Sequence, residues 1–354
     1  MFAEIERGVT LLYVQRLGEA QAAFEAALAL RPGDPHARAH LALAHLAAGR
    51  FDQGWPLYED RWNSVMKEGL ATLPRPLWSA GASLAGRTVL LKAEQGLGDT
   101  LQFVRFAPLL AARGSRVLLA VQPELVELCR SVAGVADVVR DDGPLPHFDL
   151  CIPLMSLPFA LGLTDIPVQA PYLSAPPAKT AAWAARLGPR SGKRVGLAWS
   201  GGLRPGVPEF WATNTRRNIA LARLAPIAGA PVSYYSLQKG AQAEAELHAL
   251  RAAGWDGPRI LDLPGDLDGF DDTAAVIENL DLVVTVDTSV AHLAGALGKP
   301  VWILNRYDGC WRWMLDRDDS PWYPTARIFR QESFDDWDPV VAALASALTE
   351  FAET

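Results

Sequence analysis

The stretch from residue 281 to 304 constrains the fold most, because it reads as two buried strands around one short helix. It begins with a β-branched apolar run, short enough for a strand that is buried on both faces. Asp287, Thr288 and Ser289 follow with the N-cap chemistry of a helix, and a second apolar run at 301–304 closes the unit. A helix that starts at the carboxyl end of a buried strand directs free N–H groups into a crevice. The sequence therefore predicts an α/β domain in which these three residues either seat a phosphate or only cap the helix.

Composition and charge exclude several classes of protein. The 354 residues are half apolar, enough for two ordinary cores and a small appendage. The net charge of −7 argues against a dedicated nucleic-acid binder, which would carry a basic face. Cys129, Cys151 and Cys310 stand far apart without a CxxC pair, which indicates a reducing compartment and no structural zinc. No apolar run approaches the ~18 residues of a membrane span, and early charges argue against a signal peptide, so we expect a cytoplasmic protein.

Residues 1–68 are helical and repetitive. Six residues stand at the spacings of a tetratricopeptide repeat: Gly8, Leu11, Ala20, Phe24, Ala27 and Pro32. Pro32, the last of these residues, marks a helix break. A degenerate second copy begins near His36. About two copies are visible, fewer than the roughly three that such arrays need to stand alone, so they either dock on the next domain or belong to a longer array. We predict that the aromatic-rich helix at 51–62 makes the docking contact.

Residues 69–185 alternate short strands and helices, which predicts a parallel sheet wrapped by helices. After the first strand comes the turn at 94–100, in which Gly96 and Gly98 let the backbone turn sharply beside a ligand. Asp99 then stands at the mouth of the sheet. It is either the N-cap of the next helix, a common role for Asp, or a functional carboxylate.

A second α/β half occupies residues 186–335, after a boundary rich in Pro and Ala. Its first strand, at 195–199, runs into a loop that contains Gly201 and is again open to a ligand. Four tryptophans fall close together near the end of this half, more than core filling needs. We expect two of them, Trp311 and Trp313, to line a cleft between the halves, where aromatic faces suit sugar rings.

The run Asp-Thr-Ser-x-Ala-His-Leu-Ala-Gly-Ala-Leu-Gly-Lys-Pro-Val, which starts at Asp287, resembles the donor-phosphate segment of the lipopolysaccharide heptosyltransferases, glycosyltransferase family nine. The Gly98-Asp99 turn is similar to the matching turn of that family, and the resemblance covers residues 86–354. It implies the GT-B fold, two Rossmann-like domains facing a cleft, here preceded by the short all-α repeat segment. In that fold the last helix, within 336–354, packs back on the first α/β domain.

The resemblance also implies roles for individual residues. Asp99 would be the general base that takes the acceptor proton. Contacts to the donor phosphates and nucleotide would come from a set spread over the second half: Arg216, Arg217, Gln238, Lys239, Asp287, Thr288, Ser289 and His292. Plainer roles remain open for several of them, namely a solvated pair of arginines, helix caps and a packed histidine.

The implied reaction is inverting transfer of a sugar from a nucleotide-sugar donor to a hydroxyl acceptor. Asp271-Asp272 lacks the strand-end setting of a metal-binding pair, so we expect neither a metal nor another cofactor. Some proteins that join such repeats to a GT-B domain glycosylate flagellin or other proteins, which makes a protein bound through the repeats a candidate acceptor. The alternatives are a non-catalytic scaffold for nucleotide-sugars or proteins, and a nucleotide-sugar 2-epimerase. The identity of the donor stays open.

Overall fold

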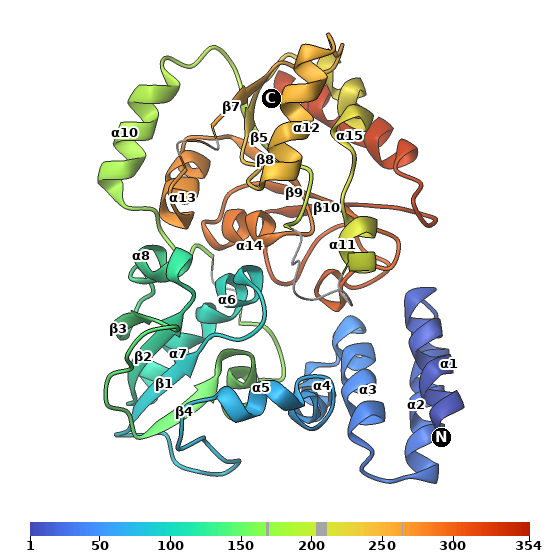
Figure 1. The fold of residues 1–354 in the computed structure, drawn as a ribbon, viewed down its shortest axis with the longest axis vertical. Coiled ribbons are helices and arrows are strands. Elements are labelled where there is room, and N and C mark those ends of the chain that lie inside the picture. The colour runs from blue at the N-terminus through green and yellow to red at the C-terminus, as the bar shows by residue number, and fades with distance from the viewer. Residues whose placement is uncertain (168–169, 203–210, 264, 266) are drawn as a thin grey trace. The chain divides into compact units, whose positions relative to one another are not determined.

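The computed structural model describes residues 1–167, 170–202, 211–263, 265 and 267–354 (Figure 1). The chain divides into two compact units, each described here by itself. The first unit comprises Met1–Gln169 with Asp308–Arg317, and the second comprises Ala170–Tyr307 with Asp318–Thr354. The division therefore falls near residue 170, earlier than the expected boundary at 185, and the segment 308–317 joins the first unit although it follows strands of the second.

The N-terminal segment forms paired helices, as predicted. Phe24 is fully buried, and a Cβ added to Gly8 would lie 2.4 Å from its ring, so only glycine permits this approach of the helices. Asp34 caps the third helix, since its Oδ1 accepts from the backbone N–H of His36 and of Ala37 at 3.1 Å each. The segment consists of α1 (Phe2–Tyr13), α2 (Leu17–Leu30), α3 (Pro35–Ala47), α4 (Phe51–Tyr58), the 3₁₀ turn η1 (Glu59–Asn63) and α5 (Lys67–Thr72).

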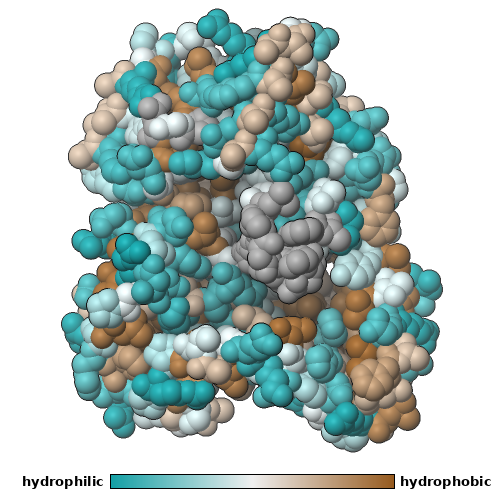
Figure 2. Space-filling model, in the orientation of Figure 1, coloured by the Kyte–Doolittle hydropathy of each residue, from teal (hydrophilic) through white to brown (hydrophobic). Residues whose placement is uncertain are grey.

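The first two helices leave large apolar side chains on the surface. Phe2, Tyr13 and Leu30 are 74%, 47% and 67% exposed. Hydrophobic colouring gathers over the part of the surface that α1 and α2 form (Figure 2). Exposed apolar side chains in one region favour contact with another protein surface.

The helix at 51–62 docks the repeat segment on the first sheet, which confirms the predicted contact. Trp55 is buried and meets the ring of Phe103 edge-on, with 6.0 Å between centroids. The guanidinium of Arg61 lies 2.8 Å from the carboxylate of Glu94 at the end of the first strand. Both charged side chains are almost completely buried, so this ion pair belongs to the core of the first unit.

The first sheet has four parallel strands in the order β3-β2-β1-β4. They are β1 (Thr88–Lys92), β2 (Arg116–Val121), β3 (Val135–Arg140) and β4 (Leu150–Pro153). The helices of this part of the chain are α6 (Leu97–Phe103), α7 (Ala107–Ala112), α8 (Val126–Cys129) and α9 (Leu157–Ala160). Because the strands are parallel, the β1–α6 turn lies at the carboxyl edge of the sheet, where α/β proteins bind ligands.

The second sheet has six parallel strands in the order β10-β9-β8-β5-β6-β7. They are β5 (Arg194–Ala198), β6 (Ser233–Ser236), β7 (Ile260–Asp262), β8 (Leu282–Val286), β9 (Val301–Asn305) and β10 (Ala326–Arg330). The helices of this unit are α10 (Pro177–Leu187), α11 (Trp211–Arg217), α12 (Ala241–Ala252), α13 (Phe270–Glu278), α14 (Ser289–Ala296) and α15 (Asp338–Glu353). Strand order reverses between β5 and β8, and this switch point is where such sheets open a crevice.

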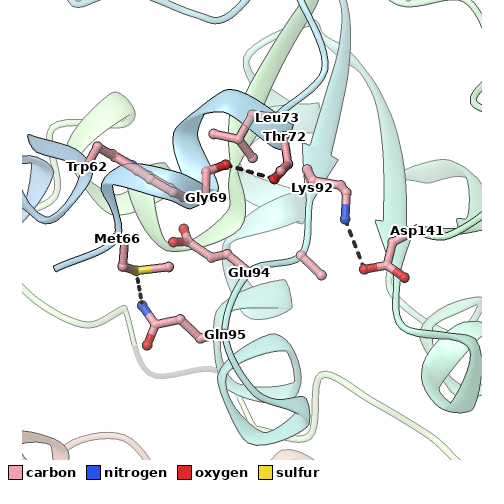
Figure 3. Close-up of a pocket in the computed structure, with 10 residues that line it drawn as sticks. Trp62, Met66, Gly69, Thr72, Leu73, Lys92, Glu94, Gln95 and Asp141 are labelled. Carbon is pink, nitrogen blue, oxygen red and sulfur yellow. Dashed lines mark hydrogen bonds and ion pairs between the residues drawn. The ribbon is translucent and has the colours of Figure 1, made fainter. Parts of the chain in front are cut away.

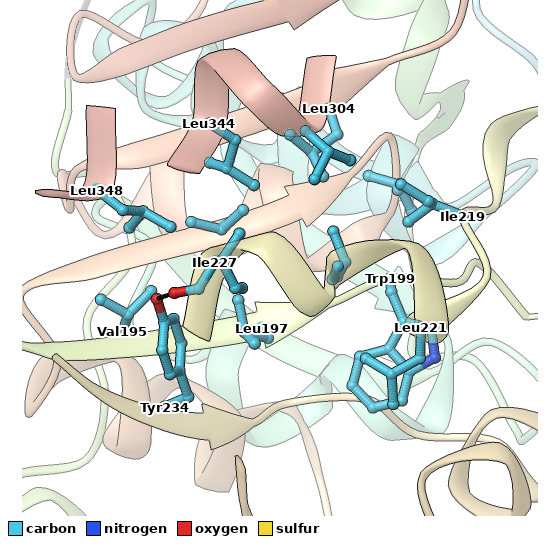
Figure 4. Close-up of a cluster of buried hydrophobic side chains, with 14 of the residues drawn as sticks. Val195, Leu197, Trp199, Ile219, Leu221, Ile227, Tyr234, Leu304, Leu344 and Leu348 are labelled. Atoms are coloured by element: carbon cyan, nitrogen blue, oxygen red, sulfur yellow. Dashed lines mark hydrogen bonds between the residues drawn. The ribbon is translucent and has the colours of Figure 1, made fainter. Parts of the chain in front are cut away.

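The last helix packs on its own unit, and the expectation that it returns to the first α/β domain is wrong. Leu344 and Leu348 of α15 join Leu304 and Ile227 in the core of the second unit (Figure 4). The helix contacts β10 and the 3₁₀ segment η6 (Leu221–Gly229). Its apolar stripe fits either sheet by pattern alone, so the sequence could not choose between them.

Helix α10 also belongs to the second unit, which explains the early boundary. Lys179 lies 2.6 Å from Asp271 and 2.6 Å from Asp272, and the Trp183 indole N–H donates to Asp272 at 3.2 Å. These contacts tie α10 to the start of α13. Within the described residues, none of the helices has the length and hydropathy needed to traverse a bilayer.

Candidate functional site

Asp99 lies in the turn at the carboxyl end of β1, where its carboxylate has two partners. It is the third residue of α6, and its Oδ2 accepts from the N–H of the N-cap Gly96 at 2.8 Å. This is a capping contact, as the plainer interpretation expected. The other oxygen, Oδ1, accepts from Arg312. The side chain keeps 18% of its surface exposed, so the carboxylate remains within reach of a ligand.

Arg312 was missed by the sequence analysis, although it is the only charged partner of Asp99 among the described residues. It lies in the 3₁₀ turn η8 (Trp311–Trp313), and its Nε donates to Gln102 Oε1 at 2.5 Å. Burial lowers the pKa of Arg312, but the Asp99 carboxylate, with smaller effects of Cys310 and Tyr58, outweighs burial and raises it. Arg312 is therefore a fixed positive charge. Since 213 residues separate it from Asp99, no local pattern could indicate the pair.

The two tryptophans beside Arg312 do not both behave as expected. Trp313 has no exposed surface, so the expectation that it faces a sugar ring is wrong for this residue. Trp311 is partly exposed, lies 4.4 Å from the Arg312 guanidinium and meets the ring of Trp55 edge-on at 5.8 Å. Trp311 therefore packs between Trp55 of the repeat segment and the Arg312 guanidinium. A guanidinium packs well against an indole face.

A pocket of about 380 Å³ opens in the first unit beside this turn (Figure 3). One wall comes from the end of the repeat segment, where η1 and the residues just after it carry Trp62 and Met66. The facing wall comes from strand ends, where Lys92 Nζ lies 2.9 Å from Asp141 Oδ2. Gln95, with a φ of 62°, closes one side and donates to the sulfur of Met66 at 3.5 Å. An apolar face opposite a charged pair suits a ligand that has both a non-polar surface and hydroxyl groups.

In the second unit, Arg217 joins the two loops at the switch point. A Cβ on Gly201, in the loop after β5, would lie 2.3 Å from the Arg217 guanidinium, so the glycine makes room for this side chain. Arg217 Nη1 also donates to the backbone oxygen of Asp287, after β8, at 3.3 Å. The structure thus brings together three predicted site residues at the carboxyl edge of β5 and β8. Arg216, the other candidate, is the preceding residue of α11 and is partly exposed.

The start of α14 faces the same strand ends. Thr288 is its N-cap, and its hydroxyl accepts from the backbone N–H of Val290 at 3.2 Å, as the capping interpretation expected. Ser289 is the first helical residue and is partly exposed. A capped helix still presents the positive end of its dipole, so capping and phosphate binding are compatible here.

Gln238 braces the loop after β5 and has no hydrogen-bonding capacity left for a nucleotide. Its Oε1 accepts from the N–H groups of Trp199 and Ser200 at 2.9 and 2.8 Å. Its Nε2 donates to the carbonyl oxygens of Ser200 and Lys239, both at 2.9 Å. These four bonds saturate the amide. The Lys239 side chain donates to the carbonyl oxygen of Leu267, which uses one of the three donors of its ammonium group.

His292 is packed inside the second unit, the plainer of its two interpretations. Only 5% of it is exposed, and its Nδ1 lies 2.8 Å from the hydroxyl of Tyr323. A Cβ on Gly295, one turn further along α14, would lie 2.3 Å from the same tyrosine ring. The family-like Ala-His-Leu-Ala-Gly run therefore seats α14 closely on Tyr323.

The described residues hold no group of three or more His, Cys, Asp or Glu side chains that could bind a metal ion. Asp271 and Asp272 pair with Lys179, as given above, which makes them part of the packing of α10.

The chain matches two protein-family models. Residues 11–54 match the tetratricopeptide repeat, and residues 211–315 match glycosyltransferase family 9 (heptosyltransferase). The second match includes Arg217, Asp287 and all of α14. Among curated proteins, the chain is 30% identical over 371 residues to protein FlbA of Caulobacter vibrioides, an alignment that covers 95% of this chain and 60% of FlbA. The chain thus spans less than two thirds of the length of this relative.

One solved structure shows the same fold, and a second is similar over a comparable part of the chain. The glycosyl transferase family 9 protein of Veillonella parvula superposes with a TM-score of 0.55 at 10% identity, over 77% of this chain and 100% of that one. The ADP-heptose lipopolysaccharide heptosyltransferase II of E. coli gives a TM-score of 0.48 at 14% identity, over 75% of this chain and 100% of that one. The Veillonella structure confirms the predicted class of Rossmann-like α/β domains, here preceded by repeat helices. The chain therefore carries one segment that matches a tetratricopeptide repeat and a later segment that matches glycosyltransferase family 9.

Proposed function

We propose that this chain transfers a sugar, with inversion and without a metal ion, from a nucleotide-sugar donor to a hydroxyl acceptor. The observation that carries the proposal is the arrangement around Arg217 at the switch point of the second sheet. One cation there contacts both Gly201 and Asp287, beside the N-terminus of α14. A guanidinium and the positive end of a helix dipole suit the diphosphate of a nucleotide-sugar and stabilise it as it leaves.

The chemistry assigns one task to each unit. The acceptor oxygen attacks the anomeric carbon of the donor sugar while Asp99 takes the proton of the acceptor hydroxyl. The bond from the anomeric carbon to the diphosphate oxygen breaks in the same step, so the configuration inverts. Arg217 and the α14 N-terminus receive the negative charge that develops on the diphosphate, a role that otherwise falls to a metal ion.

We further propose that the acceptor is a protein side chain or another hydroxyl compound that enters the pocket of the first unit. Gln95 lines this pocket and precedes Gly96, whose N–H binds the Asp99 carboxylate. The exposed apolar side chains on α1 and α2 support recruitment of a protein through the repeat segment.

Binding of nucleoside diphosphates in the presence of EDTA tests the donor seat. We expect one of ADP, UDP, GDP or CDP, or CMP, to raise the Tm by a few degrees at a concentration of about a hundred times its Kd, since such binding adds about 2.7 kcal/mol. Arg217→Ala removes a charge-assisted contact of about 1.5–3 kcal/mol and should weaken binding about 10- to 150-fold. If no nucleotide binds without a divalent cation, the metal-independent seat is wrong.

Arg190→Ala provides a matched control for this experiment. Arg190 belongs to the same unit but pairs with Asp281, just before β8, at 2.7 Å. It therefore lies at the amino edge of the sheet, opposite the proposed seat. This variant should bind the nucleotide as the wild type does. Turnover separates the remaining alternatives, since a scaffold would bind without turnover and an epimerase would isomerise the donor without an acceptor.

A further inference from the structure

Three side chains of the first unit form a buried polar chain that ends at Asp99. Gln102 Oε1 accepts from Arg312 Nε, and Arg312 Nη2 donates to Asp99 Oδ1. Gln102 is fully buried and Arg312 is 7% exposed. Exposure increases from Gln102 through Arg312 to the Asp99 side chain, where it reaches 18%. These hydrogen-bonded side chains therefore extend from the interior of the first unit to the carboxylate that we propose as the base.

The guanidinium of Arg312 is held on every side that the structure describes. It lies 4.4 Å from the Trp311 ring and 6.0 Å from the Phe103 ring. Its Nη1 donates to the sulfur of Cys310 at 3.1 Å. A planar fork that is stacked and hydrogen-bonded in this way has one orientation, which a lysine ammonium could not reproduce.

We propose that Arg312 is a positioning residue for Asp99, and that Gln102 in turn fixes Arg312. This inference rests on the proposed function, in which Asp99 is the base. A carboxylate has about four acceptor positions, and the described contacts of Asp99 use two, one to Gly96 and one to Arg312. These two contacts prevent rotation of the carboxylate. The Asp99 side chain keeps 18% of its surface exposed, and an acceptor hydroxyl would approach from that exposed side.

The same contacts connect the repeat segment to the base. Trp55 of α4 touches Trp311, the neighbour of Arg312, and also touches Phe103, the last residue of α6. The docking helix thus supports both sides of the Asp99–Arg312 pair. This arrangement gives the repeat a structural role in the chemistry, in addition to any protein that it binds.

Variants of Arg312 test the inference. Turnover is measured as release of nucleoside diphosphate from the sugar nucleotide that the wild type uses, with water or the acceptor as the nucleophile. We expect Arg312→Gln to lower kcat about 10- to 100-fold while the Kd of the donor changes less than twofold. Arg312→Lys, which keeps the charge but loses the fork, should recover only part of that loss. Gln102→Met, which keeps the volume but not the acceptor, should lower kcat several-fold in a folded protein.

A double variant separates positioning from general structural support. If Arg312 acts through Asp99, then Asp99→Asn combined with Arg312→Gln should be no slower than Asp99→Asn alone. A merely structural arginine would instead add its full loss to the double variant. If the wild type turns over and both Arg312→Gln and Gln102→Met keep its kcat, the positioning role of Arg312 is wrong while the proposed function stands. A wild-type chain that binds nucleotide but releases no nucleoside diphosphate overturns the proposed function and this inference together.

Discussion

Replacing Arg61 by methionine should destabilise the first unit by about 3–5 kcal/mol near pH 8, because it leaves a buried carboxylate without its charge partner. Arg61 donates to both oxygens of Glu94, through Nε at 3.1 Å and Nη2 at 2.8 Å. It also donates to Ser156 Oγ at 2.7 Å. Of its contacts with the described residues, the Glu94 carboxylate would keep its bond from the Met155 N–H at 2.9 Å. At about 2–4 °C per kcal/mol, the expected loss lowers the Tm by about 6–20 °C.

The loss should be smaller near pH 5 than near pH 8. Burial raises the pKa of Glu94 even though Arg61 opposes it. A carboxylate whose folded-state pKa lies above its unfolded-state value favours folding at low pH, and this benefit disappears as pH rises through the folded-state pKa. Without Arg61 the pKa of Glu94 rises further. The variant can then bury a neutral Glu94 in mild acid, where the destabilisation is partly relieved.

The assay is urea denaturation followed by tryptophan fluorescence at the two pH values. Arg16→Met is the matched control, since Arg16 forms an ion pair with Glu19 at 2.6 Å but its side chain is 58% exposed. This control should match the wild type within error. Arg61→Met combined with Glu94→Gln should recover part of the loss, because no buried charge remains. A loss below about 1 kcal/mol near pH 8, or an equal loss at both pH values, would show that Arg61 does not compensate a buried charge on Glu94.

Three further predictions concern the second unit. Gly295→Ala should lower the free energy of unfolding by about 1–3 kcal/mol or more, since its Cβ would collide with the Tyr323 ring. Thermal melts should then show a lower Tm than for the control Gly229→Ala, where nothing lies within 4 Å of the added Cβ. Thr288→Ala should cost about 1 kcal/mol through loss of the cap, measured by urea denaturation, and an unchanged midpoint would contradict the capping geometry. Gln238→Leu should weaken nucleotide binding in titration calorimetry because it frees the loop after β5, and wild-type affinity would show that the brace is dispensable.

Local patterns predicted the elements that depend on neighbouring residues. The spacing of small and aromatic residues indicated the repeat, and Phe24 against Gly8 shows why those residue types are needed. The apolar run before Asp287 indicated β8, and the cap at Thr288 followed from chain order. Each of these features is set within a few turns of chain, where sequence and geometry correspond closely.

Contacts between distant segments could not be predicted in the same way. The segment 308–317 joins the first unit, so Arg312 reaches Asp99 although strands β5 to β9 of the second sheet lie between them in the sequence. The stripe on α15 fits two sheets equally by pattern and packs on the second. Gln238 stands at a strand end, as a ligand contact would, but its amide is saturated by the backbone. Residue type and position allow several partners in each case, and only packing selects one.

Sugar transfer with Asp99 as the base and without a metal ion is best tested by the release of nucleoside diphosphate from a sugar nucleotide in EDTA, measured for the wild type and for Asp99→Asn. We expect wild-type release without a divalent cation and an inverted anomeric configuration in the product. We also expect the Asp99→Asn variant to bind the donor equally but to turn over about 10²- to 10⁴-fold more slowly. Equal turnover by the two proteins would contradict Asp99 as the base, and release that requires a divalent cation would contradict the phosphate seat built around Arg217.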